Sequence, residues 1–324
     1  MSTMAQDEIT EINEAVGRRW RSIDPLLPEP SGLPKEGCGT PIKASAKDGS
    51  PAGLAVCRHQ HVPADSLSQT WEAAAKFTLT MRLREADTRA AADDLLTQWR
   101  DHLGDLPEPE EAREDDTSAV VTWPSRDVTG IRALLKHGLQ PITVIAVRRA
   151  GLPAPNHGET HDLVIRHAEP ADQDAVTELE LDVIHYDARF GAAFPRPATP
   201  SLVREATRKN LEQRPDWTWL ATKRGRPVGL AVVEPPAEAG WIAGLTRPGR
   251  TAYLASMFMS PEERGAGTGA RLIANVHDAL DTRGIDLTLL HYAQLNPLSG
   301  PFWHRMGYRP LWSTWAALPA STLR

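Results

Sequence analysis

The sequence predicts a mixed α/β protein whose two structured halves lie in tandem. The chain has 324 residues, about twice the ~150 of one ordinary domain. Apolar runs of strand length alternate with amphipathic stretches of helix length in both halves. The halves also end alike: residues 119–145 and 287–313 each read as strand, loop, helix, glycine and strand, with Gly138 aligned to Gly307. This similarity favours a diverged duplication over two unrelated domains that share one supersecondary unit.

The composition is that of a globular protein without a strongly charged binding surface. Hydrophobic residues make up 41% and charged residues 24% of the chain, and the formal net charge is -6. Without a basic excess, neither nucleic acid nor a membrane surface is an expected partner. Two cysteines, Cys38 and Cys57, argue against a disulfide scaffold. The polar N-terminus is unlike a signal peptide, and no apolar run reaches the ~18 residues of a membrane span. We therefore expect a cytoplasmic monomer or homodimer.

The first half begins with an amphipathic helix and continues through alternating strands and helices. Ile9, Ile12, Val16 and Trp20 recur at helical spacing in the first helix. The apolar runs that follow are short enough for strands and are separated by two further helical patterns. The expected helices span 7–21, 88–103 and 128–137, and the expected strands span 52–61, 76–84, 118–123 and 141–148.

Two stretches interrupt this pattern. Residues 105–117 are acidic and contain two prolines, which is typical of an exposed loop. Residues 151–161 combine glycine, proline and asparagine without apolar periodicity. We therefore expect a linker at 151–161, between a first domain at 1–150 and a second domain at 162–324.

The second half follows the same alternation. Its clearest helix has an apolar stripe formed by Leu272, Ile273, Val276 and Leu280, and Gly284 stands where a helix commonly ends. The expected strands span 163–167, 217–223, 227–233, 251–259, 285–293 and 308–317, and the expected helices span 170–185, 201–213, 267–282 and 297–306.

The most informative segment runs from Arg264 to Ala270. It follows an apolar strand, contains three glycines, and leads into the amphipathic helix. Backbone amides at a helix start have no partner within the helix, and the helix dipole attracts anions there. Glycines allow phosphate oxygens to reach the backbone, and Arg264 adds a positive charge. The segment therefore predicts a phosphate-containing ligand.

Two common phosphate-binding motifs fit this segment less well. A Walker A loop is excluded, because no Gly-Lys-Ser/Thr closes the turn. Gly265, Gly267 and Ala270 match the Gly-x-Gly-x-x-Ala of a dinucleotide-binding fold, which also needs an acid at the end of the next strand. Asp286 has nearly the right spacing but stands at the start of its expected strand. An NAD(P)-dependent oxidoreductase therefore remains only as a lesser alternative.

The segment Arg264-Gly-Ala-Gly267-Thr-Gly269 resembles the acetyl-CoA signature Arg/Gln-x-x-Gly-x-Gly/Ala of the GNAT superfamily of N-acetyltransferases. Residues 296–308 resemble a second family block, Asn-x-x-Ala/Ser-x-x-Phe-aromatic-x-x-x-Gly-Phe/Tyr. The resemblance covers about residues 162–320, and both blocks stand on the expected elements. It implies a layered α/β fold with a mixed, mostly antiparallel sheet, and two GNAT-like domains in tandem.

The resemblance also implies the cofactor and its site. Acetyl-CoA, or another acyl-CoA, would be the cosubstrate, with no metal. Its pantetheine arm would lie between the splayed strands 251–259 and 285–293, and its pyrophosphate would lie on the glycine-rich turn. The implied cofactor-binding residues are Met257, Phe258, Met259, Arg264, Gly265, Ala266, Gly267, Thr268, Gly269, Ala270, Asn296, Ser299, Phe302 and Trp303.

The implied reaction is direct attack of a small amine on the thioester carbonyl, which backbone donors would polarise. Many family members protonate the leaving thiolate with a tyrosine, but here that position is Trp303. An indole donates a hydrogen bond without releasing its proton. This difference also leaves room for a non-catalytic acyl-CoA sensor or assembly module. Candidates for the base that takes the amine proton are His291, in the first place, then His185, Asp187 and Glu234.

The first half lacks the phosphate-binding pattern. If its helix 88–103 matches the motif helix, Ala90 and Ala92 replace the two glycines and Asp87 replaces the arginine. Methyl groups and a negative charge would repel a pyrophosphate, so we expect no cofactor there. The stretch Cys57-Arg-His59-Gln-His61 places three potential ligands on one strand face. A zinc site usually needs a fourth ligand and wider spacing, so we expect no metal.

Overall fold

The computed structural model describes residues 6–30, 39–84, 88–106, 113–153 and 162–323. In this part of the chain, both halves join one 11-stranded sheet with the order β1-β2-β3-β4-β11-β5-β10-β9-β8-β7-β6. Most neighbouring strands are antiparallel, and β3–β4 and β9–β10 are parallel. The predicted fold class is confirmed. The strands are β1 (Thr40–Ser45), β2 (Pro51–His61), β3 (Ala75–Leu83), β4 (Thr117–Pro124), β5 (Gln140–Arg149), β6 (Leu163–His167), β7 (Thr218–Lys223), β8 (Arg226–Glu234), β9 (Thr251–Met259), β10 (Leu287–Ala293) and β11 (Arg309–Ala317).

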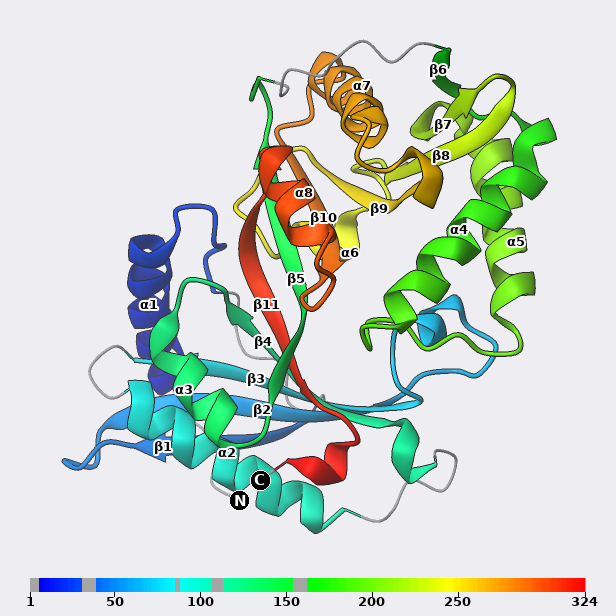
Figure 1. The fold of residues 1–324 in the computed structure, drawn as a ribbon. Coiled ribbons are helices and arrows are strands. Elements are labelled where there is room, and N and C mark those ends of the chain that lie inside the picture. The colour runs from blue at the N-terminus through cyan, green and yellow to red at the C-terminus, as the bar shows by residue number, and fades with distance from the viewer. Residues whose placement is uncertain (1–5, 31–38, 85–87, 107–112, 154–161, 324) are drawn as a thin grey trace.

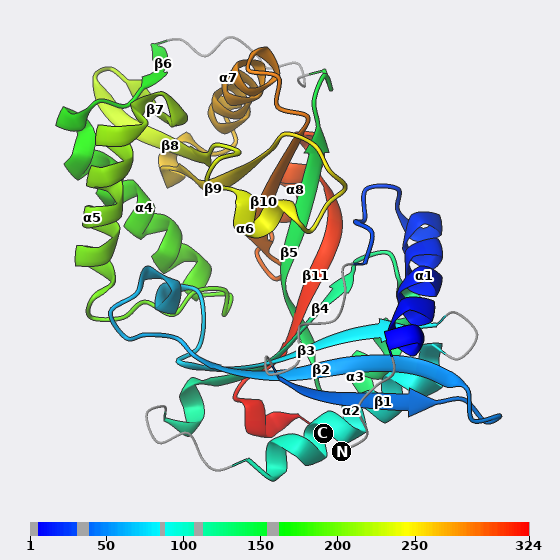
Figure 2. The same cartoon turned by 180° about the vertical axis from the view of Figure 1, so that it is seen from behind.

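Helices cover both faces of this sheet (Figure 1). In the first half, α2 and α3 pack on one face through a core that includes Leu95, Trp99 and Leu134, and α1 packs on the other. In the second half, α7 and α8 cover one face, and α4 and α5 stand beside the other (Figure 2). The helices are α1 (Gln6–Ile23), α2 (Thr88–Gly104), α3 (Val128–Lys136), α4 (Gln173–Ala188), α5 (Thr199–Gln213), α6 (Gly240–Ala243), α7 (Thr268–Thr282) and α8 (Ser299–Arg305).

The two halves exchange their last strands. β11, from the end of the chain, lies between β4 and β5 of the first half. β5, in turn, lies between β11 and β10. In Figure 1 these two long strands run side by side through the middle of the molecule. The exchange was not predicted, because local periodicity identifies strands but carries no information on which distant strand becomes a neighbour.

The order of elements is similar in the two halves. Each contains an antiparallel series that ends in a parallel pair, with β3 beside β4 and β9 beside β10. Gly138 precedes β5 and Gly307 precedes β11, and both have a left-handed conformation, with φ of 82° and 87°. This correspondence supports the inferred duplication.

The predicted helices and strands are confirmed to within a few residues at each end, but β1 and α6 were missed. α2 begins at Thr88, as the predicted helix does, and Ala90 and Ala92 lie inside it. Asp87, Cys38, most of the predicted linker and much of the acidic loop lie outside the described residues. No helix in the described part of the chain has the length and apolarity needed to cross a membrane.

Candidate functional site

The sheet divides where β9 and β10 meet. Their parallel pairing ends at Leu254 opposite Leu290. Beyond this point β9 stays paired with β8 as far as Met259, and β10 stays paired with β5 as far as Ala293. A bulge in β9 between Leu254 and Ser256 marks the place where the strands separate. The two strands therefore open into a V whose inner backbone edges have no strand neighbour.

The turn after β9 presents free backbone amides at the start of α7. Thr268 begins the helix, and Gly267 precedes it in a left-handed conformation with φ of 81°. Gly265 has φ of 80°, and at both glycines the space where a side chain would begin is open. Within the described residues, no amide from Gly265 to Ala270 donates to another protein group. These amides and the positive end of the helix dipole suit an anion such as a phosphate.

The charges around this turn are compatible with a bound anion. The carboxylate of Glu263 is neutralised by Lys223, at 2.8 Å. Arg264 donates from Nε to the carbonyl oxygen of Met259 at 3.0 Å, and its guanidinium lies 4.8 Å from the centre of the Tyr186 ring. The first turn of α7 holds no acidic side chain. The turn therefore has a positive charge fixed beside it, and the first turn of α7 adds no negative charge.

A large cavity extends from this turn to the first half of the chain. Its volume is about 1340 Å³, above the ~300–1,000 Å³ of an ordinary ligand pocket. Of the residues predicted to bind the cofactor, Ala266 and Thr268 do not line the cavity and the others do. Those that line it are Met257, Phe258, Met259, Arg264, Gly265, Gly267, Gly269, Ala270, Asn296, Ser299, Phe302 and Trp303.

Four polar or aromatic side chains meet near the vertex of the V. The hydroxyl of Tyr253 lies 3.0 Å from Nδ1 of His291, and Nε1 of Trp241 donates to Oε2 of Glu234 at 2.8 Å. The Trp241 ring lies edge-on to the Tyr253 ring and parallel to the His291 ring. All four residues line the cavity. The structure thus brings the predicted bases His291 and Glu234 into one cluster.

The cluster shifts the pKa values of its members in different directions. Burial lowers the pKa of His291 to about 4, so its imidazole is neutral near pH 7. Burial raises the pKa of Glu234, although the hydrogen bond from Trp241 and the charge of Arg214 oppose this. Burial, reinforced by the Glu234 carboxylate, raises the pKa of Tyr253, so its hydroxyl keeps its proton. Of the two predicted bases here, Glu234 has the raised proton affinity.

Two more carboxylates line the cavity from α4. Burial raises the pKa of Asp187 to about 6, and a hydrogen bond from the side chain of Asn296 opposes the rise. Burial raises the pKa of Glu180 to about 7, and the hydroxyl of Thr207 donates to it at 2.7 Å. His185, on the same helix, is exposed and does not line the cavity. The structure therefore places His185 away from the other candidate bases.

Sequence reasoning missed three residues of this site. Tyr253 is the register partner of Glu234 on the neighbouring strand, and strand register is not visible in the sequence. Trp241 belongs to the four-residue helix α6, in a stretch without periodicity. Glu180 could have been predicted as a further candidate base, because it is an acid on the same helix as Asp187.

The residues invoked by the alternative interpretations lie elsewhere. Asp286 accepts a hydrogen bond from the backbone of Arg250 at the start of β9 and β10, at the opposite end of these strands from the glycine-rich turn. Cys57 lies in the hydrophobic core, where burial raises the pKa of its thiol to about 12. His59 stacks on Phe77 at 4.4 Å. Within the described residues, no group of three or more His, Cys, Asp or Glu could hold a metal ion.

The corresponding place in the first half contains a buried arginine. The parallel pairing of β3 and β4 ends at Thr78 opposite Val120. At the far end of β3, Arg19 of α1 donates to the carbonyl oxygen of Leu83 at 3.3 Å and forms a buried ion pair with Asp127. The guanidinium of Arg19 therefore donates a hydrogen bond to the last carbonyl oxygen of this strand.

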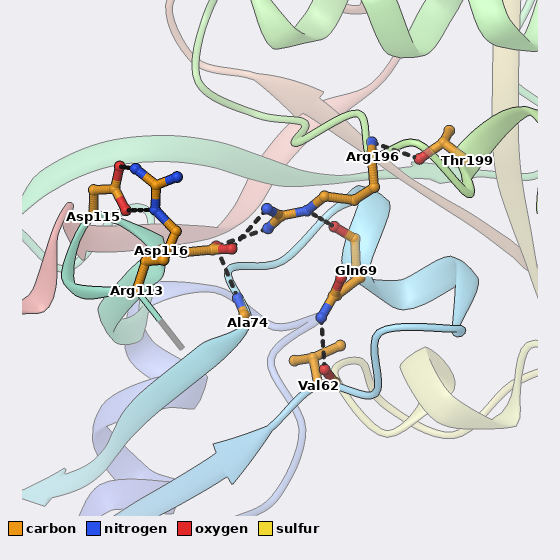
Figure 3. A network of polar contacts seen from close by, with 8 residues as sticks. All are labelled: Val62, Gln69, Ala74, Arg113, Asp115, Asp116, Arg196 and Thr199. Atoms are coloured by element: carbon orange, nitrogen blue, oxygen red, sulfur yellow. Dashed lines mark hydrogen bonds and ion pairs between the residues drawn. The ribbon is translucent and has the colours of Figure 1, made fainter. Parts of the chain in front are cut away.

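Contacts between the halves fix the far wall of the cavity (Figure 3). Arg196, between α4 and α5, donates two hydrogen bonds to Asp116, of 2.6 and 2.7 Å. Its Nε donates to the carbonyl oxygen of Gln69 at 3.5 Å, and the hydroxyls of Thr70 and Thr199 lie 3.1 Å apart. These contacts fasten the β2–β3 connection to the α4–α5 connection, and both connections contribute residues to the cavity.

Comparison with known proteins agrees with this geometry. Residues 185–308 match the acetyltransferase (GNAT) family model. A GCN5-related N-acetyltransferase from Sphaerobacter thermophilus is similar with a TM-score of 0.54 and 14% identity, over 88% of this chain and 82% of that chain. A GNAT-family acetyltransferase from Colwellia psychrerythraea is similar with a TM-score of 0.50 and 10% identity, over 98% of this chain and 97% of that chain. No curated protein matches the sequence. The chain therefore adopts the GNAT fold and carries, at residues 185–308, a domain of the GNAT acetyltransferase family.

Proposed function

We propose that this protein transfers an acyl group, most simply acetyl, from acyl-CoA to the amine of a small molecule. The observation that carries the proposal is that one cavity contains both the open V between β9 and β10 and the free amides of residues 265–270. An extended pantetheine arm can pair with the inner edge of β9. The pyrophosphate can then lie on the turn, beside the guanidinium of Arg264.

The proposed reaction is direct transfer without an acyl-enzyme intermediate. The amine nitrogen attacks the thioester carbonyl carbon, the new C–N bond forms, and the C–S bond then breaks. Unpaired backbone amides of β9 within the V are suited to hydrogen-bond the carbonyl oxygen as its charge develops. Trp303 stands where a tyrosine could protonate the leaving thiolate, so we assign that proton to water.

We assign the general base to Glu234. Its pKa is raised, it lines the cavity, and Trp241 holds one of its carboxylate oxygens. His291 is the weaker base because burial lowers its pKa to about 4. We give His291 and Tyr253 the role of a hydrogen-bonded pair that shapes the site beside the carbonyl.

We further propose that the first half binds no cofactor and serves as a wall of the acceptor site. Three observations support these different roles of the two halves. The strand end that would correspond to the cofactor turn is satisfied by Arg19. The first turn of α2 carries Arg89 and Ala90 in place of a glycine. The β2–β3 connection and the faces of β3 and β4 line the cavity instead.

The test is release of free CoA from acetyl-CoA by the purified protein, with and without a library of small amines. Release that depends on an amine supports the acyltransferase. Tight binding of acetyl-CoA without release under any amine would support the non-catalytic sensor instead. Thermal stabilisation by NAD(P) but not by CoA would overturn both interpretations, because a ligand that binds the folded state raises its apparent stability.

A matched pair of variants tests where the pyrophosphate lies. Gly267 and Gly225 both have a left-handed conformation, with φ of 81° and 76°, and open space beside them. Gly267→Glu and Gly225→Glu therefore introduce the same backbone strain and the same charge. We expect only Gly267→Glu to abolish CoA binding in calorimetry. Unchanged CoA affinity in that variant would contradict the placement.

A further inference from the structure

The floor of the cavity is an open face of the first half's sheet. Side chains alternate along β3 and β4: Phe77, Leu79 and Val121 enter the core under α2 and α3, whereas Thr78 and Thr122 line the cavity. α1 covers only part of the same face, where it contacts β2 and β3 (Figures 1 and 2). A substrate in the cavity therefore meets sheet side chains directly.

This floor presents a row of hydroxyl groups. Thr122 of β4 is the register partner of Thr314 of β11, which is the register partner of Thr143 of β5. The three threonines line the cavity on adjacent strands, about 4.8 Å apart. Within the described chain, their hydroxyls make no hydrogen bond to protein, and the nearby Thr78 hydroxyl is buried without a partner. A row of free hydroxyls can donate to and accept from polar groups of a ligand.

An unpaired cation stands at the outer end of the floor. Arg58 of β2 is the register partner of Thr78 and lines the cavity. Lys76, two residues before Thr78 on β3, is neutralised by Glu72. No carboxylate in the described part of the chain lies within ion-pair distance of Arg58. Arg305 also lines the cavity without such a partner, but it lies on α8 among the residues assigned to the cofactor.

Carboxylates line the opposite end of the cavity, and the charge of Arg214 acts on two of them, Glu234 and Glu180. Glu234, Asp187 and Glu180 line it near the V, where a protonated amine must arrive before it loses its proton. Arg58 on β2 and His291 on β10 are separated by four intervening strands. Five strand spacings correspond to roughly 24 Å along a flat sheet, and the bend of this sheet shortens the path through space. The two ends lie on strands that are not neighbours in the sheet, so an acceptor that contacts both must be elongated.

We propose that the acceptor is an elongated amine with an anionic group at its far end, and that Arg58 binds that group. This proposal rests on the acyltransferase function proposed above. The amine lies beside Glu234, the body of the acceptor lies along Thr143, Thr314 and Thr122, and the anion pairs with the guanidinium. Arg58 is exposed, so solvent screens such a contact, and we expect it to contribute up to about 1 kcal/mol, equivalent to up to about a 5-fold change in affinity.

The experiment uses a series of ω-amino carboxylates with 4 to 12 carbons, each compared with its ω-amino carboxamide, in the CoA-release assay on the full chain. The carboxamide keeps the length and removes the charge. We expect kcat/KM to favour the carboxylate by about 2- to 5-fold among the longer members only. Equal kcat/KM for acid and amide at every length would overturn the proposal, whereas no release with any amine would instead refute the acyltransferase function.

Variants assign the effect to the floor. Arg58→Gln should remove the preference for the carboxylate over the carboxamide. Arg132→Gln is the matched control, because Arg132 is exposed on α3 and does not line the cavity. Thr314→Val, which keeps the shape and removes the hydroxyl, should raise KM for long acceptors more than for short ones. A preference for the carboxylate that survives Arg58→Gln would exclude Arg58 as its binding residue.

Discussion

Glu234 and His291 lie in one hydrogen-bonded cluster, yet their environments suit them for different tasks. Trp241 donates to one oxygen of Glu234, and the other oxygen has no protein partner within the described residues. The Nδ1 atom of His291 is engaged by Tyr253, and burial holds its pKa near 4. A base must take up a proton near the working pH, so the carboxylate with the raised pKa is the better candidate. The exposed ring of Trp241 lines the cavity beside Glu234, next to the proposed position of the amine.

The first prediction concerns this assignment. Glu234→Gln keeps the size of the side chain and an acceptor for Trp241, but it cannot take a proton. We expect kcat to fall by about 100-fold or more, with little change in KM for acetyl-CoA, because general base catalysis contributes roughly 10²–10⁴-fold. Steady-state CoA release across pH 6–9 measures this, and the control His291→Asn should have the smaller effect. A larger loss of kcat in His291→Asn would return the role of base to His291.

Glu180 gives a prediction on stability and pH. Its pKa is about 7 in the folded protein because burial disfavours its charge, and it is lower when the chain unfolds. The folded state therefore holds a proton that the unfolded state releases, and stability is lost as pH rises through about 7. Glu180→Gln removes this loss and can still accept from Thr207. We expect its Tm at pH 8 to exceed the wild-type value by roughly 2–4 °C, with little difference at pH 4.5.

The control for Glu180 is Glu178→Gln, an exposed position on the same helix. Differential scanning fluorimetry at pH 4.5, 6 and 8 separates the variants. If Glu180→Gln and the wild type lose the same Tm between pH 4.5 and pH 8, the ionisation of Glu180 does not limit stability.

At the scale of elements, the sequence predicted what local chemistry determines. The glycine-rich turn and α7 were readable because an apolar strand, left-handed glycines and an amphipathic stripe are local features. The bulge in β9 that separates the strands, and the register that pairs Glu234 with Tyr253, depend on neighbours distant in the chain. β1 was missed because its sequence, TPIKAS, contains few apolar residues and a proline, although Ala44 is buried in the core.

The connection between α4 and α5 depends on one ion pair for its position against the first half. Arg196 and Asp116 are both partly buried and make two hydrogen bonds. Burial alone would raise the pKa of Asp116, but the hydrogen bonds and charge of Arg196, with the Ala74 amide, lower it. A lowered pKa means that the stabilisation is present above about pH 4 and is lost as pH falls through the folded-state value.

We therefore predict that Arg196→Met lowers the stability by about 1–3 kcal/mol at pH 7, and that its difference from the wild type shrinks as pH falls below about 4. It should also raise KM for the amine, because the wall of the cavity loosens. Arg113→Met is the matched control: Arg113 pairs with the adjacent Asp115 in Figure 3 but is exposed, and such pairs contribute roughly 0–1 kcal/mol. Equal effects of the two variants at pH 7 would show that the Arg196 contact does not hold the wall.

At the scale of the whole molecule, the strand exchange makes the two halves depend on each other. β11 completes the sheet of the first half, and β5 completes the sheet of the second half, so the V at β10 is supported by a strand from the first half. The long sheet that results places the floor of one half opposite the cofactor turn of the other. Residues of both halves line the cavity, so the proposed acceptor site belongs to neither half alone.

The last prediction follows from this exchange. Residues 162–324 produced alone would leave β10 without β5, and β11 without both of its neighbours. Unpaired strand edges of this length promote association, so we expect the fragment to aggregate or to lack a cooperative thermal transition. Residues 1–153 alone should behave in the same way, because β4 loses β11.

Co-expression of the two fragments should restore a 1:1 complex with amine-dependent CoA release. Size-exclusion chromatography with light scattering and circular dichroism measure these outcomes. A soluble, cooperatively folded 162–324 fragment with full activity would show that the exchanged strands are dispensable and that the first half takes no part in catalysis.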